Sequence, residues 1–182
     1  MPNIELPPQG LVTTAMAVPE RLVDKYRHRW PTDFDESLEA AVASIETVFG
    51  QAPGFVPFVR TLRGGEMRHF EINPNADADD WTEQLAELVL RTRAQVLTLG
   101  RSFLIDETDL GLDAPEYRLG LASVDAMAGD GRHEFAHCLV DIGGRAKRAT
   151  EWFTGELSGV AQASFHVRQL RPALAALAAN SK

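Results

Sequence analysis

The sequence predicts an α+β protein in which an antiparallel sheet of about five strands is covered by helices, with a helix pair at the N-terminal end and further helices at the C-terminal end. Three observations lead to this class. Apolar residues recur at helical spacing over residues 33–49 and 81–93. Between residues 55 and 142 they form several short strand-like runs, and glycine pairs separate some neighbouring runs.

The N-terminal segment, residues 1–17, is rich in proline and is expected to form an extended arm. This leaves residues 18–182 as a single α+β domain, long enough to bury a core. Pro19 suits the first turn of a helix that reaches to about Trp30, because proline at the first helical position loses no helix hydrogen bond. Pro31 ends this helix.

The clearest helical pattern covers residues 33–49. Its apolar residues lie on one stripe, which is formed by Phe34, Leu38, Val42, Ile45 and Phe49. Thr32 and Asp35 resemble a capping box at the start of this helix. Gly50 follows as its terminator.

A β-hairpin is predicted after Pro53. Residues 55–62 and 67–72 form the two strand-like runs, and Gly64 and Gly65 lie in the turn between them. Pro57 indicates that the first strand either lies at a sheet edge or starts late.

Three further strands are predicted in meander order after a helix from Trp81 to about Arg93. They cover residues 94–105, 117–127 and 133–142. The last two runs are joined by a glycine-rich turn at residues 128–131, which favours antiparallel pairing.

The C-terminal part is expected to be helical. A helix is predicted from Arg145 to Leu157, with its apolar residues Ala149, Trp152, Phe153 and Leu157 facing inward. Residues 160–170 are ambiguous, because their apolar residues alternate as in a strand. Pro172 can open a last helix rich in alanine and leucine.

The bulk composition narrows the class of protein. The formal net charge of −8 argues against general binding to nucleic acids or anionic membranes. Cys138 is the only cysteine, so no intrachain disulfide can form and a reducing compartment is favoured. The start of the chain lacks the features of a secretion signal, and no stretch has the ~20 apolar residues that span a bilayer. A cytoplasmic location is therefore expected.

One segment suggests a chemistry by itself: residues 133–137 spell HExxH. On a helix, the two histidines of this motif lie one turn apart on one face, and Glu134 can act as general base on a zinc-bound water. Eighteen residues separate His137 from Glu156. These four residues resemble the gluzincin class of zinc metallopeptidases. The resemblance implies that His133, His137 and Glu156 bind zinc and leave one coordination position open.

The same segment fits a strand better than a helix. Gly129 and Gly131 lie just upstream, and glycine is a poor helix former. On a strand, His133 and His137 lie about 13 Å apart along the axis. Two ligands of one zinc ion must each come within about 2 Å of it. We therefore predict a strand over residues 133–142, in which the motif is coincidental and binds no metal or other cofactor, with the zinc site as the alternative.

The function expected from the sequence is that of a non-enzymatic accessory or interaction domain. Its composition suggests a bacterial or phage setting. It is expected to act through a protein partner or by self-association, and the contacts are assigned to the proline-rich arm and the helix at residues 33–49. The alternative function is that of a small gluzincin-like zinc hydrolase with Glu134 as its catalytic base. Cys138 is expected to be a core residue rather than a nucleophile.

Overall fold

The computed structural model describes residues 12–15, 19–49, 57–72, 78–104, 119–141, 147–156 and 167–182. These residues form one antiparallel sheet with the strand order β1-β8-β6-β5-β4-β2-β3, and β7 pairs with β6 beside this path. The strands are β1 (Val12–Ala15), β2 (Phe58–Arg63), β3 (Glu66–Glu71), β4 (Val96–Leu104), β5 (Leu119–Ala128), β6 (His133–Asp141), β7 (Lys147–Arg148) and β8 (Phe153–Glu156). The predicted fold class is confirmed, although the sheet has more strands than expected.

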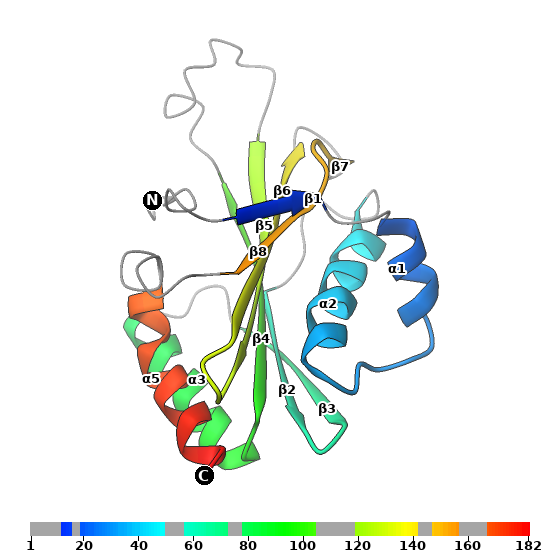
Figure 1. Cartoon of the computed structure of the whole chain (residues 1–182). Coiled ribbons are helices and arrows are strands. Elements are labelled where there is room, and N and C mark those ends of the chain that lie inside the picture. The colour runs from blue at the N-terminus through cyan, green and yellow to red at the C-terminus, as the bar shows by residue number, and fades with distance from the viewer. Residues whose placement is uncertain are drawn as a thin grey trace.

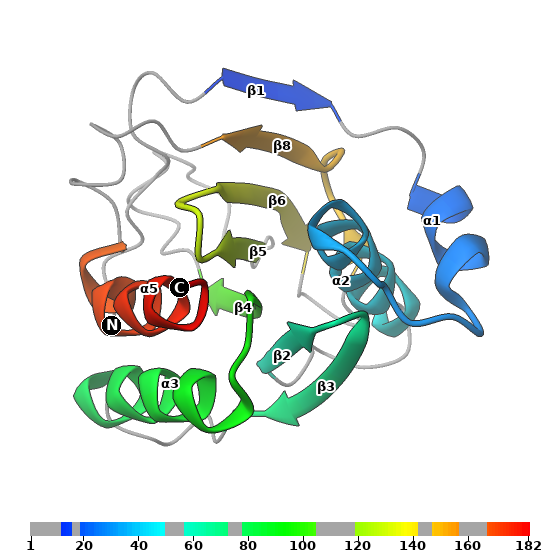
Figure 2. The ribbon, with the colours of Figure 1, turned by 60° about the horizontal axis from the view of Figure 1, so that its bottom comes forward.

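The helices lie in two layers, one on each side of the sheet. They are α1 (Pro19–Tyr26), α2 (Phe34–Val48), α3 (Ala78–Thr92) and α5 (Val167–Asn180). Figures 1 and 2 show α1 and α2 together on one side and α3 and α5 together on the other. The sheet therefore separates two hydrophobic cores. No helix in the described part of the chain is long and apolar enough to cross a membrane.

The core under α2 follows from the apolar stripe of that helix. Phe34, Leu38, Val42 and Ile45 are all buried, as predicted. They belong to the same cluster as small and β-branched residues of the central strands, namely Ala122, Val124, Ala126, Ala136, Cys138 and Val140. The small residues of β5 and β6 let the larger side chains of the helix lie close to the sheet.

The start of α2 is capped one residue later than the sequence predicted. Asp33 is the N-cap, and its carboxylate accepts a hydrogen bond from the backbone N–H of Glu36 at 2.9 Å. The carboxylate of Glu36 in turn accepts one from the N–H of Thr32 at 3.0 Å. Asp33 therefore caps the helix in place of the predicted box of Thr32 and Asp35, and Glu36 bonds back to Thr32, one residue before the N-cap.

The predicted hairpin is confirmed. Gly64 and Gly65 form the turn with φ values of 56° and 80°, which only glycine adopts without strain. The first strand begins at Phe58, directly after Pro57. Because β2 pairs with both β3 and β4, it is an interior strand, and proline marks its late start.

The helix predicted over residues 145–157 is wrong. Residues 147–148 and 153–156 of this segment are strands, and both strands pair with β6. Between them, Trp152 is fully buried and its indole N–H donates to Glu46 of α2 at 2.6 Å. Of the apolar residues that suggested a helix, Phe153 lies on a strand and Trp152 packs in the core. The two strands cover an edge of β6 that would otherwise be unpaired.

The last helix, α5, starts earlier than the predicted start at Pro172. Pro172 lies inside α5, which begins at Val167. The missing N–H of this proline would have bonded to the carbonyl of residue 168, so only one hydrogen bond of the first turns is lost. The remaining part of the ambiguous stretch, residues 160–166, lies outside the described residues.

Candidate functional site

The HExxH segment lies on a strand, as the preferred prediction stated. His133–Asp141 forms β6, an interior strand that pairs with β5 and β8. Successive side chains of a strand point to opposite faces, so His133 and His137 share one face and Glu134 lies on the other. This alternation separates the expected zinc ligands from the expected catalytic base.

His133 belongs to a buried polar network. Its Nε2 lies 2.9 Å from Oδ1 of Asp125, which is itself fully buried. The other carboxylate oxygen of Asp125 forms an ion pair with Arg101 at 3.3 Å. Burial lowers the pKa of Arg101, and the charge of Asp125 opposes this change. The ring of His133 thus contributes to the solvation of a buried carboxylate.

His137 has an aromatic environment. Its ring stacks on Phe135, with ring centroids 5.1 Å apart, and faces Phe153 of β8 at 5.9 Å. Burial lowers the pKa of His137, which favours the neutral ring. The two histidines of the motif therefore have separate structural contacts.

Glu134 and Glu156, the two glutamates of the predicted zinc site, lie on neighbouring strands. The carboxylate of Glu134 accepts a charged hydrogen bond from Arg132 at 2.8 Å. Glu156 lies in β8 opposite Glu134 in the strand register. No group of three or more histidine, cysteine or acidic residues within the described ranges is placed to hold a metal ion. The helix geometry on which the zinc resemblance depends is not formed at this motif.

The sulfur of Cys138 lies in the core beneath α2 and is fully buried. Burial raises the pKa of its thiol above the ordinary value, and the nearby carboxylate of Glu46 adds to this effect. Cys138 is therefore a core residue, as predicted, and its thiol is poorly suited to act as a nucleophile.

The structure places a pocket of about 360 Å³ where α1 gives way to α2. We call it the Trp30 pocket, and it is lined by Tyr26, Arg27, His28, Arg29, Trp30, Pro31, Ala40, Ser44 and Arg60. The lining is basic and aromatic in a chain with a net charge of −8. No aspartate or glutamate is among these lining residues.

Arg60 is the most deeply placed cation of the Trp30 pocket, with 5% of its surface exposed. Its Nε donates to Nδ1 of His69 at 3.2 Å, and its Nη2 donates to Oγ of Ser44 at 2.6 Å. Its guanidinium carbon lies 5.4 Å from the ring centre of Trp30 and 4.8 Å from that of Phe58. Burial lowers the pKa of Arg60 to about 10, so the side chain remains protonated at neutral pH.

The other charged residues around the Trp30 pocket have partners. Arg27 forms an ion pair with Asp24 at 2.9 Å, and Arg29 forms one with Glu36. The hydroxyl of Tyr26 donates to Glu39 at 2.6 Å. Burial raises the pKa of Tyr26, and the hydrogen bond and charge of Glu39 raise it further.

Trp30 lies outside the helix that the sequence predicted for it. The first helix was expected to reach to about Trp30, but α1 ends at Tyr26, and 57% of Trp30 is exposed. Residues 27–33 form the connection to α2, and Trp30 lies within this connection. The signal that sequence reasoning missed is the aromatic and basic run at residues 26–30 within an otherwise acidic N-terminal part.

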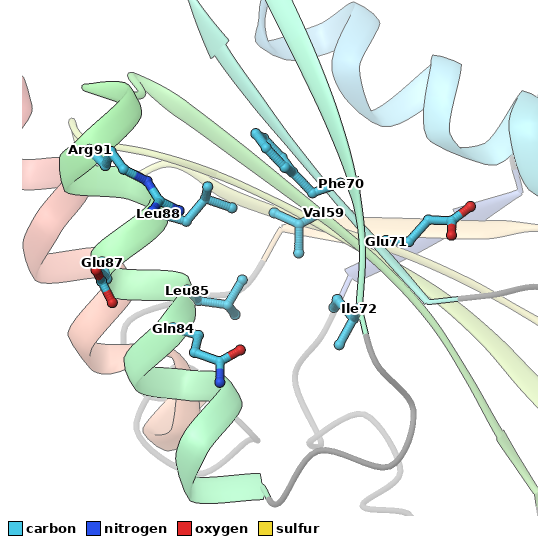
Figure 3. Close-up of a pocket in the computed structure, with 9 residues that line it drawn as sticks. All are labelled: Val59, Phe70, Glu71, Ile72, Gln84, Leu85, Glu87, Leu88 and Arg91. Carbon is cyan, nitrogen blue, oxygen red and sulfur yellow. The ribbon is translucent and has the colours of Figure 1, made fainter.

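A second hollow, of about 370 Å³, lies between α3 and β3. Figure 3 shows the apolar side chains of Val59, Leu85 and Leu88 converging from the sheet and the helix. The surrounding polar residues are Glu71, Gln84, Glu87 and Arg91. The floor of this hollow is apolar, and its described lining residues do not identify a ligand or a partner.

Comparison of the chain with family models, with curated proteins and with solved structures finds no match. Of the two hollows, the Trp30 pocket has the more distinctive chemistry, because it combines a buried cation with an exposed indole.

Proposed function

We propose that the protein is a non-enzymatic interaction domain that contacts a partner protein at the Trp30 pocket. The observation that carries the proposal is the position of Trp30, which is largely exposed and lies against the guanidinium of Arg60. Tryptophan and arginine are the residues most enriched among those that dominate protein–protein binding energy. An exposed indole beside a pocket offers a large apolar contact surface with little side-chain entropy to lose.

The helix expected to make contacts is largely used inside the molecule. Eight residues of α2 are buried, and they include its whole predicted apolar stripe up to Ile45. This helix contributes Ala40 and Ser44 to the wall of the Trp30 pocket. We therefore place the contact at the end of α1 and not along α2.

The proline-rich arm retains its place as a second contact segment in the proposal. Val12–Ala15 of this arm forms β1, which pairs with β8 at one end of the sheet. The other residues of the arm lie outside the described residues. Deletion of residues 1–17 tests this assignment through the size of the protein in solution.

The chain supplies a matched pair of variants for the test. Trp30 and Leu90 are the exposed large hydrophobic residues of the described part, at 57% and 52% exposure, and Leu90 lies on α3 outside the Trp30 pocket. Trp30→Ser and Leu90→Ser each replace an apolar side chain that is more than half exposed, at two different sites. Both variants should fold normally, which the thermal unfolding temperature checks.

The test measures retention of proteins from an extract of the native cells on immobilised wild type and on each variant. We expect a partner that wild type and Leu90→Ser retain equally and that Trp30→Ser retains at least about tenfold less, since loss of a dominant contact costs about 2 kcal/mol or more. Sedimentation velocity separates a second copy of the chain from a different partner. Equal retention by Trp30→Ser would contradict the proposal, as would a monomeric chain that retains nothing.

A further inference from the structure

We propose that the Trp30 pocket is a carboxylate-binding site in which Arg60 is the anchor, so that the partner contacts this chain through an acidic side chain or its C-terminal carboxylate. The identity of the partner as a protein rests on the proposed function. The ligand chemistry does not, because it follows from the surroundings of Arg60 alone.

The two buried arginines of the described residues provide an internal comparison. Arg101, with 8% exposure, has the buried carboxylate of Asp125 at 3.3 Å. Arg60, with 5% exposure, has no carboxylate within ion-pair distance among the described residues. A buried charge is costly unless it is paired, so Arg60 lacks the group that completes Arg101.

The hydrogen bonds of Arg60 define which of its donors remain. A guanidinium has five N–H donors. Nε donates to His69 and one N–H of Nη2 donates to Ser44, and both acceptors are uncharged, because Nδ1 of His69 accepts only in the neutral ring. Nη1 has no hydrogen-bond partner among the described residues. Nη1 and the second N–H of Nη2 form the fork that binds the two oxygens of a carboxylate.

The walls of the Trp30 pocket suit an anion of this size. Tyr26 and Trp30 provide aromatic surface that keeps water from the guanidinium and so strengthens a charged contact. Arg27 and Arg29 add positive potential at the rim, although each has its own acidic partner. The volume of about 360 Å³ is near the lower end for ligand pockets, which fits one small acidic group.

The direct test uses sodium benzoate as the probe, with benzamide as its uncharged analogue. Binding is followed by the NMR signal of the Trp30 indole N–H, which the Trp30→Phe variant assigns. We expect benzoate to shift this signal in a saturable way and benzamide to shift it at least about tenfold less. An equal response to benzamide would show that the pocket selects the ring and not the charge, and this would overturn the proposal.

A second comparison uses arginine variants on one strand. Arg60→Met should abolish the benzoate response, whereas Arg63→Met, at an exposed position of β2 outside the pocket, should leave it unchanged. Arg60→Met should also keep or raise the thermal unfolding temperature, because it removes a buried charge that has no ionic partner. A benzoate response that survives in Arg60→Met would refute the assignment. The wild-type comparison of benzoate with benzamide remains decisive even where this variant folds poorly.

Inorganic phosphate is the third probe and distinguishes two kinds of anion. We expect phosphate to shift the Trp30 signal more weakly than benzoate does, and tighter binding of phosphate would contradict the carboxylate assignment. The two proposals fail separately. A benzoate site in a chain that retains no partner would reject the interaction function only, and retention of a partner without a benzoate response would reject the carboxylate site only.

Discussion

His133 and His137 show how strongly the chemistry of a residue depends on its neighbours. They point to the same face of one strand, four positions apart. His133 bonds to a buried carboxylate, whereas His137 lies against two phenylalanine rings. The carboxylate of Asp125 offers the ring of His133 a hydrogen-bond partner, whereas the apolar surroundings of His137 favour the uncharged form of its ring.

The environment of His137 predicts a pH dependence of stability. Burial lowers the pKa of His137 in the folded protein, so the unfolded chain binds a proton at a higher pH than the folded chain does. Stability is therefore fully present above the ordinary histidine pKa and is lost as the pH falls through the lowered value. We expect the free energy of unfolding in urea to decrease between about pH 7.5 and 5.5.

The variant His137→Phe isolates this contribution, because phenylalanine keeps the contacts with Phe135 and Phe153 and cannot titrate. The pH dependence should become weaker in the variant. It should not vanish, since burial and the charge of Arg60 also lower the pKa of His69. An unchanged pH dependence in His137→Phe would remove His137 as a source of this effect.

The sequence predicted the environment of some site residues and not of others. The strand environment of His133 and His137 was predictable, because alternation and the upstream glycines are local signals. The Trp30 pocket was not predictable, because Ser44 and Arg60 approach the connection between α1 and α2 only in the folded chain. The exposure of Trp30 depends on where α1 ends, and helix ends are poorly defined by apolar spacing alone.

At the scale of elements, local patterns predicted some segments well and tertiary pairing decided others. The long helix α2 and the hairpin β2–β3 carry their own signals, in a stripe of apolar residues and a glycine turn. Residues 145–157 carry helix-like spacing, yet their strands are fixed by pairing with β6. Propensity is a weak guide where a neighbouring strand needs a partner.

The contact between α5 and the β5–β6 turn is an element-scale feature with a specific test. A Cβ atom at Gly129 would overlap Oγ of Ser181 and the backbone carbonyl of Leu177 at the end of α5. The side chain of Ser181 can rotate. The helix backbone, however, cannot move without disturbing the buried hydrophobic cluster to which Leu177 belongs. We expect Gly129→Ala to destabilise the protein by about 1 to 3 kcal/mol through overpacking.

Urea unfolding measures this loss, and faster hydrogen exchange in the last turns of α5 locates it. Asp130→Asn is the control, because it changes the next residue of the same turn at an exposed position and keeps an acceptor for the N–H of Arg132. Gly129→Ala should therefore differ clearly from Asp130→Asn. Equal stability of the two variants would mean that α5 does not pack on the turn as described.

At the scale of the whole molecule, one sheet separates two cores, and each face of the sheet carries one of the two buried arginines of the described residues. Arg101, which pairs with Asp125, shares its strand face with Leu97 and Leu99, and these two leucines pack in the core with α3 and α5. Arg60 lies on the other side, where it bonds to Ser44 of α2. The first arginine is completed within the chain. The second faces a pocket at the periphery, which is where a binding partner can complete it.

The last prediction concerns the metal content of the whole protein. Protein purified without chelator is expected to contain far less than one zinc ion per chain by elemental analysis, because β6 holds the two histidines of the motif on extended backbone. Glu134→Gln should leave the unfolding free energy within about 0.5 kcal/mol of wild type, since its ion pair with Arg132 is at the surface. His133→Ala should cost about 1 to 3 kcal/mol, because it removes a hydrogen bond from the buried carboxylate of Asp125. One zinc ion per chain that His137→Ala abolishes would instead require a helical site at this motif and would restore the hydrolase hypothesis with His133, His137 and Glu156 as ligands.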